Sequence, residues 1–369
     1  MSGPVYTDLV ASLPATVPFV GPETQERARG GVFSARLGAT ENVFGPSPVA
    51  IAAMADAASA VWQYGDPENF HLKQALSAHH PVGVENIVVG EGIDGLLGYL
   101  CRMMVEPGVK VVTSQGAYPT FNFHVSGYGG ELVTVPYNGD YEDPVALMEK
   151  AAEVGARLVY LANPDNPMGT VHCAEVIKAA IENVPDDCLF ILDEAYVEFA
   201  PKGSAPDLDI DDKRVIRMRT FSKAYGMAGA RVGYAIGHEE VINSFNKIRN
   251  HFGMCRISQA GAFAALKDQN YLRETIKAVE IGRKRIEMIV GEQGLSVVPS
   301  ATNFVAIDCG QDAAFARSVL DQLIARDIFV RMPFVEPQNR CIRVSVGQKA
   351  DLSLFELQFP LALEAASEG

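Results

Sequence analysis

The sequence lacks an excess of basic residues. Its 369 residues include 31 Lys and Arg against 45 Asp and Glu, which gives a formal net charge of −14. Nonspecific binding to nucleic acid relies on positive surface charge, so this balance argues against a nucleic-acid partner. The N-terminus shows no basic-then-apolar signal pattern, and no uncharged apolar run reaches membrane-spanning length. We therefore expect a cytoplasmic protein without a membrane partner.

Motifs of metal and redox sites are also missing. The cysteines form no Cys-x-x-Cys pair, and no His-Glu-x-x-His motif occurs. These absences argue against zinc sites and thioredoxin-like chemistry, and we expect no metal site. Scattered cysteines of this kind are typical of buried thiols in a reducing compartment. They are Cys101, Cys173, Cys188, Cys255, Cys309 and Cys341.

What is present indicates a large α/β protein. Hydrophobic residues make up 48% of the chain and charged residues 21%, as in ordinary globular proteins. Apolar strands alternate with helices from about residue 85 to 236, which predicts a mostly parallel sheet flanked by helices. We expect a large domain over 43–260 and a smaller α+β domain over 261–369. Residues 1–42 are expected to form an extended arm and part of the small domain.

The sequence contains partial matches to two nucleotide-binding motifs, and each lacks a required residue. Gly90 to Gly95 spells Gly-x-G-x-x-G after a strand, but the next strand ends in Thr113-Ser114-Gln115, without the acidic residue that a dinucleotide fold needs. Asp193-Glu194 follows an apolar strand as in P-loop ATPases, yet no Gly-Lys dipeptide occurs anywhere. A phosphate at the helix start after Gly90 remains physically reasonable, because free N–H groups there favour anions.

The most informative stretch is Thr220 to Tyr234, where a lysine lies among small residues. Ser222, Lys223 and Arg231 offer a hydroxyl, an amine and a guanidinium group. An amine condenses with an aldehyde, while the other two groups can hold a phosphate. The set suits pyridoxal 5′-phosphate. Taken alone, it is also compatible with a surface lysine and an arginine in a salt bridge.

The run from Ser222 to Tyr234 resembles the lysine motif of fold-type I, pyridoxal-phosphate-dependent aminotransferases. Within these enzymes it is most similar to the histidinol-phosphate aminotransferase group, and the resemblance extends from about Arg36 to the last helix. It implies an aspartate aminotransferase-like fold and a homodimer with shared active sites. It also implies that Lys223 bonds covalently to the cofactor and then transfers a proton from the substrate.

The same resemblance implies roles for other residues around the cofactor. The backbone of Ile93 and Asp94, with Ser222 and Arg231, would hold the phosphate, together with Tyr64 from the partner subunit. Tyr118 would stack on the ring. Asp193 would pair with the ring nitrogen and act in catalysis with Lys223 and Tyr196, while Asn166 and Tyr196 would donate to the ring oxygen. As a lone residue, Tyr118 could equally be core packing.

Substrate contacts are implied for Arg331, Arg343 and Asn42. Arginine matches carboxylate and phosphate geometry, although Arg343 could also be a strand-edge charge in a salt bridge. Family members carry an Asn-Glu-Asn-Pro core, in which Thr40 and Val43 here replace the first Asn and the Pro. The substrates that this group implies are L-histidinol phosphate and 2-oxoglutarate. The alternatives are an aromatic or broad-specificity aminotransferase, a phospho-amino-acid decarboxylase, and a noncatalytic cofactor-binding module.

Overall fold

A seven-stranded sheet forms the centre of the computed structural model, which describes residues 3–15 and 20–368. Its strand order is β2-β8-β7-β6-β5-β3-β4, and only β8 runs antiparallel to its neighbours. Such strands are buried on both faces, so they read as continuous apolar runs. They are β2 (Ile87–Gly90), β3 (Lys110–Ser114), β4 (Glu131–Val135), β5 (Leu158–Ala162), β6 (Leu189–Asp193), β7 (Val215–Thr220) and β8 (Gly233–Gly237).

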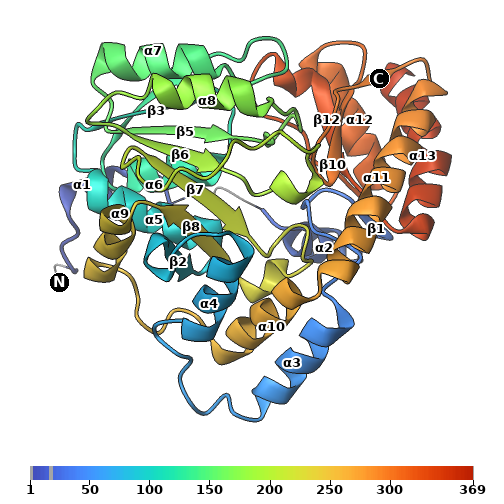
Figure 1. Cartoon of the computed structure of the whole chain (residues 1–369). Helices are drawn as coiled ribbons and strands as arrows, with labels where there is room; N and C mark the ends of the chain where they lie inside the picture. Colours follow the sequence, from blue (N-terminus) through green and yellow to red (C-terminus); the bar gives the residue numbers. More distant parts are fainter. Residues whose placement is uncertain (1–2, 16–19, 369) are drawn as a thin grey trace.

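Helices cover both faces of this sheet (Figure 1). On one face α5 (Gly92–Met104) and α6 (Pro119–Gly127) pack through Leu97 and Phe121. On the other, α7 (Pro144–Val154) and α8 (Ala174–Glu182) contribute a second apolar layer. Shorter elements complete this part, namely α9 (Glu239–Ser244), η1 (Val84–Asn86), η2 (Val197–Phe199), η3 (Ala228–Ala230) and η4 (Phe245–Lys247).

A second, smaller sheet lies toward the C-terminus. It is antiparallel in the order β12-β10-β9, and its strands are β9 (Ser296–Val297), β10 (Phe304–Asp308) and β12 (Cys341–Ser345). The helices of this part of the chain are α11 (Gln269–Gly291), α12 (Ala313–Ala325), α13 (Lys349–Glu368) and η5 (Gln338–Arg340). Near the N-terminus, β1 (Ala35–Arg36) pairs in parallel with β11 (Ile328–Phe329). The beginning of the chain is therefore joined to its last hundred residues.

The remaining helices are α1 (Asp8–Ser12), α2 (Pro22–Arg29), α3 (Pro48–Ala58), α4 (Phe70–His79) and α10 (Arg256–Lys267). Helix α10 packs against α3 and α4. The α3 helix has a capped start: the Ser47 side chain accepts a hydrogen bond from the Ala50 N–H, and Pro48 occupies the first turn. None of the helices formed by residues 3–15 and 20–368 is long and apolar enough to cross a membrane.

The α/β class and the mostly parallel sheet were predicted correctly, whereas several details were wrong. The first 35 residues contain α1 and α2, so within the described part they are not simply extended. Helices α6 and α8 were not anticipated, and neither has a side-chain hydrogen bond at its N-cap. Two cysteines, Cys173 and Cys255, are exposed and not buried.

Candidate active site

A cavity of about 400 Å³ opens at the carboxyl ends of β5, β6 and β7, where open α/β sheets bind ligands. Segment 39–41 and strand β12 close its opposite side. Most residues predicted for the site line this one cavity. They are Ile93, Asp94, Tyr118, Asn166, Asp193, Tyr196, Ser222, Lys223, Arg231, Arg331 and Arg343.

Asp193 is a buried carboxyl group at the end of β6. Its oxygens accept hydrogen bonds from the Tyr160 hydroxyl at 2.7 Å and from the Ala195 N–H at 2.9 Å. Burial raises the pKa of Asp193 to about 6, although the Tyr160 and Ala195 hydrogen bonds and the charge of Lys223 oppose the shift. A buried carboxylate without a cationic hydrogen-bond partner is costly, so this group is suited to meet a cationic ligand atom.

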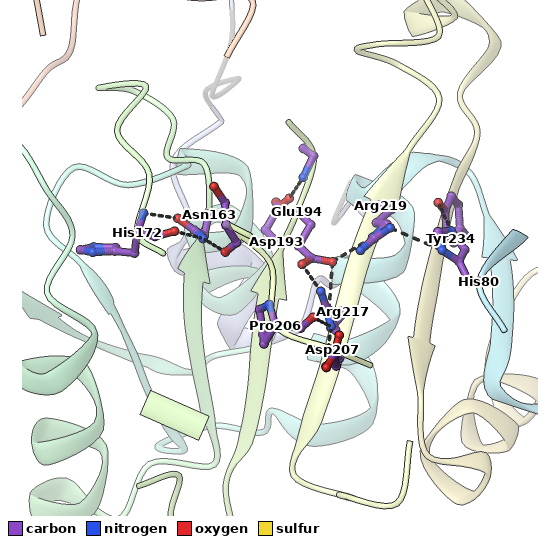
Figure 2. A network of polar contacts seen from close by, with 12 residues as sticks. His80, Asn163, His172, Asp193, Glu194, Pro206, Asp207, Arg217, Arg219 and Tyr234 are labelled. Atoms are coloured by element: carbon purple, nitrogen blue, oxygen red, sulfur yellow. Dashed lines mark hydrogen bonds and ion pairs between the residues drawn. The ribbon is translucent and has the colours of Figure 1, made fainter. Parts of the chain in front are cut away.

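The next residue, Glu194, connects the end of β6 to β7 through hydrogen bonds with two arginines of β7 (Figure 2). Its carboxylate accepts hydrogen bonds from Arg217 at 2.5 and 3.0 Å and from Arg219 at 2.9 Å. Burial alone would raise the pKa of Glu194, but Arg219 and Arg217 outweigh it and hold the pKa below its ordinary value. This network fixes the strand end on which Asp193 is placed.

Lys223 follows β7 and projects its amine into the cavity. Its Nζ donates to the Thr40 hydroxyl at 2.8 Å and to the Thr40 carbonyl at 3.2 Å, and it lies 5.3 Å from the centre of the Tyr196 ring. The Asn42 amide donates to the backbone carbonyls of Lys223 and Ala224 at 3.0 and 3.1 Å. Both the side chain and the backbone of Lys223 are thus held by segment 40–42.

An anion-binding corner lies beside this lysine. The Arg231 guanidinium donates to the Ser222 hydroxyl at 3.3 Å and to the Ala228 carbonyl at 3.2 Å, and the salt bridges of the described residues include none to Arg231. Arg231 adopts a left-handed φ of 52°. Its charge therefore faces one hydroxyl and one carbonyl instead of a carboxylate, which leaves it able to bind an anion.

Two glycines bring Arg231 against the start of α5. A Cβ on Gly92 would lie 2.4 Å from the Arg231 Nη2, and a Cβ on Gly233 would lie 2.6 Å from the Ile93 nitrogen. No side chain caps α5, so the N–H groups of its first turn, including those of Ile93 and Asp94, are available. A helix N-terminus next to a guanidinium group is a favourable phosphate site.

Two arginines form the opposite wall. Arg331 and Arg343 pair through their backbones, and both side chains line the cavity. Burial, and then the charge of Arg331, lower the pKa of Arg343 to about 10. The Arg343 Nη1 donates to the Asn166 Oδ1 at 2.5 Å, while its Nε is buried without a hydrogen-bond partner among the residues described. Arg331 donates to the Val20 carbonyl at 2.6 Å. The wall is therefore suited to a carboxylate or phosphate group.

Tyr118 and Tyr196 place aromatic rings around the same space. Tyr118 stands directly before α6, and burial raises the pKa of its hydroxyl. Tyr196 is buried, and its hydroxyl donates to the Thr40 Oγ1 at 3.4 Å. A flat heterocycle with a phosphate, a cationic ring nitrogen and an aldehyde would find a matching group for each feature here. The residues therefore fit pyridoxal phosphate.

Two predicted site residues do not line the cavity. Asn42 lies behind the lysine loop, where its oxygen also accepts from the Phe44 N–H at 3.1 Å. Tyr64 is 76% exposed, and its ring packs against Phe252 with centroids 4.7 Å apart. A surface position is compatible with the prediction that Tyr64 serves a partner subunit.

Sequence reasoning missed several residues that shape the site. Thr40 was noted only as a substitution, and Tyr160 was not singled out. Two buried carboxyl groups were missed altogether: Glu142 accepts from the Ser114 hydroxyl at 2.5 Å and the Ala162 N–H at 3.0 Å, and Asp165 accepts from the Tyr137 hydroxyl at 3.0 Å. Asp165 closely follows β5, which was an available signal, whereas Glu142 lies in the loop before α7, well beyond the end of β4, and carried none.

Comparisons with known proteins agree with this geometry. A family model described as "Aminotransferase class I and II" matches residues 35–354. Histidinol-phosphate aminotransferase 2 of Carboxydothermus hydrogenoformans is 34% identical over 93% of this chain and 94% of its own. The crystal structure of histidinol-phosphate aminotransferase from Sinorhizobium meliloti in complex with pyridoxal-5′-phosphate is 50% identical, covers 98% of both chains and superimposes with a TM-score of 0.96.

More distant structures share the fold. Aspartate aminotransferase from Thermus thermophilus, solved with maleate, is 21% identical and superimposes with a TM-score of 0.81 over 98% of this chain. At this identity the likeness concerns the fold alone, which is the aspartate aminotransferase-like fold predicted from the sequence. The family match over most of the chain means that this protein belongs to the class I and II aminotransferases.

Proposed function

We propose that the protein transfers the amino group of L-histidinol phosphate to 2-oxoglutarate with pyridoxal phosphate as cofactor. The observation that carries this proposal is the pair of arginines, Arg331 and Arg343, which pair through their backbones and line the same cavity as Lys223. They can serve a phosphate in one half-reaction and carboxylates in the other. The relatives named for this activity, 34% and 50% identical, support the choice of substrate.

The cofactor would be held by residues on three sides of the cavity. Arg231, Ser222 and the first turn of α5 would bind its phosphate. Asp193 would pair with the ring nitrogen, and Asn166 and Tyr196 would bind the ring oxygen. Tyr118 would lie against the ring face. When bound, the cofactor supplies an electron sink for the bond broken at the substrate Cα.

The chain itself supplies the proton transfer and the orientation. The Lys223 Nζ would take the proton from the substrate Cα and deliver the same proton to the C4′ atom of the bound cofactor. Arg343, whose Nε has no protein partner among the described residues, would bind the distal anionic group of the substrate with Arg331.

Assembly and location are further parts of the proposal. We infer a homodimer in the cytoplasm, in which Tyr64 of each subunit reaches the phosphate of its partner. We also propose domains over 43–260 and 261–369, with residues 1–42 joining the smaller one. The pairing of β1 with β11 supports the last assignment.

A single-turnover visible spectrum tests the activity. Cofactor-loaded protein is mixed with L-histidinol phosphate in the absence of any oxo acid. We expect the absorbance band of the lysine-bound cofactor to disappear and that of pyridoxamine phosphate to grow. Lys223→Ala should lack the first band, whereas the control Lys178→Ala, at an exposed position on α8, should behave like the wild type.

Other outcomes would redirect the proposal. Conversion with phenylalanine but not with L-histidinol phosphate would indicate a broad or aromatic aminotransferase. Release of carbon dioxide from a phosphorylated amino acid would favour a decarboxylase. A Lys223→Ala variant that kept both the band and turnover would overturn the assignment of the lysine.

A further inference from the structure

Thr40 has an unusual backbone. Four non-glycine residues of the described chain have a positive φ, namely Thr40, Asn69, Arg231 and Asp327, and only Thr40 is β-branched. Its φ is 55°, in the left-handed region, where a β-branched side chain is strained. Such strain persists only when surrounding contacts enforce it, and it is concentrated at functional sites.

The surrounding contacts do enforce this conformation. The Thr40 N–H donates to the Ser345 hydroxyl at 3.1 Å, and the Thr40 carbonyl accepts from the Asn303 amide at 3.1 Å. Only 4% of the residue is exposed. The neighbouring Glu41 carbonyl also accepts from Asn303 at 3.1 Å. Ser345 at the end of β12 and Asn303 just before β10 therefore hold Thr40 in place from the side of the small sheet.

In this conformation the hydroxyl and carbonyl oxygens of Thr40 both accept hydrogen bonds from the Lys223 amine. The Lys223 Nζ donates to the Thr40 Oγ1 at 2.8 Å and to the Thr40 carbonyl at 3.2 Å. A turn alone would be satisfied better by Gly or Asn, which tolerate a left-handed φ. The hydroxyl group is what threonine adds at this position, and it faces the lysine.

We propose that Thr40 is the positioning residue for the Lys223 amine. A neutral amine has two N–H groups and one lone pair. With both N–H groups directed to Thr40, the lone pair is left free and fixed in direction, as a group that must accept a proton requires. The catalytic part of this proposal rests on the proposed function, whereas the contact between Thr40 and Lys223 does not.

The first test uses the cofactor-free protein. Lys223 is modified with fluorodinitrobenzene at fixed pH, and its peptide is quantified by mass spectrometry. Thr40→Val keeps the branched shape and removes the hydroxyl group, so the modification rate should rise about fivefold, the equivalent of one hydrogen bond. Thr40→Ser should restore the wild-type rate. The matched control is Thr275→Val, at a buried position on α11.

The second test uses the loaded enzyme with L-glutamate deuterated at Cα. In Thr40→Val we expect kcat to fall about 10- to 100-fold with little change in KM, because the amine is displaced from its reacting position. The deuterium isotope effect on kcat should rise, since proton transfer becomes slower. Thr40→Ser should restore both.

The outcomes separate the two proposals. Equal or lower modification rates in Thr40→Val would overturn the role of Thr40 whatever the enzyme's substrate is. A rise in modification rate without any effect on kcat or on the isotope effect would overturn its role in catalysis. If no donor is converted by the wild type, the proposed function fails, while the modification experiment still decides the contact between Thr40 and Lys223.

Discussion

At the scale of single residues, the site is distinguished by charged groups that other protein residues only partly satisfy. Arg343 is buried, its Nη1 is bonded to Asn166 and its Nε has no partner in the described part of the chain. Asp193 is buried with a raised pKa, caused by its burial. Leaving such groups unsatisfied costs stability, so their presence in one cavity indicates a ligand that completes them.

Arg343 provides a prediction at this scale. Lysine cannot reproduce a planar two-point contact with a carboxylate, so Arg343→Lys should raise the KM for 2-oxoglutarate about 10- to 100-fold. Steady-state kinetics with varied oxo acid measures the change. Arg340→Lys is the matched control, because Arg340 bonds Asp140 and Asp308 outside the cavity and should leave KM unchanged. An unaltered KM in Arg343→Lys would contradict the substrate role of this arginine.

At the scale of secondary structure elements, two buried carboxyl groups connect the strand ends beneath the site. Glu142 accepts hydrogen bonds from the Ser114 hydroxyl at the end of β3 and from the Ala162 N–H at the end of β5. Asp165 accepts a hydrogen bond from the Met168 N–H at 2.9 Å within the following turn. Burial, and then the charge of Asp165, raise the pKa of Glu142 well above its ordinary value. Burial raises the pKa of Asp165 to about 6. The turn that contains Asn166 is thus held by two buried carboxyl groups, Glu142 and Asp165, whose raised pKa values favour the protonated form.

This pair predicts how stability depends on pH. Both folded pKa values lie above the unfolded values of about 4, so the folded protein binds protons that the unfolded chain releases. The stabilisation is complete below pH 4. It is lost as pH rises to about 6 for Asp165 and further for Glu142. The contribution of this pair to the free energy of unfolding, measured with urea, should therefore fall as pH rises from 5 to 8. His79, His80 and His172, whose pKa values burial lowers, contribute in the opposite direction in both the wild type and its carboxyl variants.

Glu142→Gln tests the origin of this dependence. Glutamine cannot ionise, so the variant should lose less stability than the wild type between pH 5 and 8, and it should gain relative to the wild type as pH rises. Asp193 and Glu198, whose pKa values burial raises to about 6 and 7, keep their share of the effect in both proteins. Glu149→Gln, at an exposed position on α7, serves as control. Parallel curves for the variant and the wild type would contradict the role of Glu142.

At the scale of the whole molecule, the exposed position of Tyr64 leads to a prediction about the dimer. Co-expression of Lys223→Ala with Tyr64→Ala produces hybrid dimers with one defect in each subunit. If sites are shared, the subunit with Tyr64→Ala keeps its own lysine and receives an intact Tyr64 from its partner. Each hybrid should then regain one fully active site, about half of the wild-type activity per dimer.

Purified hybrids, separated by two affinity tags, allow this comparison. The two parent variants, Lys223→Ala and Tyr64→Ala, are the controls. The Tyr64→Ala parent should bind the cofactor about tenfold more weakly, since it loses a hydrogen bond to a charged phosphate. Hybrids no more active than half of the Tyr64→Ala parent would show that each tyrosine serves its own subunit or none.

The sequence allowed the fold and most of the cavity to be predicted, because strand ends and one long motif carry that information locally. Asp193 ends an apolar strand, and Lys223 and Arg231 belong to one continuous run. Thr40 could not be assigned in this way, since its role depends on a rare backbone conformation and on contact with a residue 183 positions away. Helices α6 and α8 were missed, and neither has a side-chain hydrogen bond at its N-cap; α5 also lacks one, but it follows a recognisable glycine motif.

The bonds from Thr40 and Asn42 to the lysine loop have a consequence for how the chain can vary in length. Thr40 is hydrogen-bonded to the Lys223 side chain and Asn42 to the Lys223 backbone. The distance between these two residues along the chain therefore matches the distance between the backbone and the amine of Lys223. One residue inserted between them would leave either the amine or the loop without its partner, although no side chain had been changed. In segment 40–42 the number of residues is therefore as restricted as their identity.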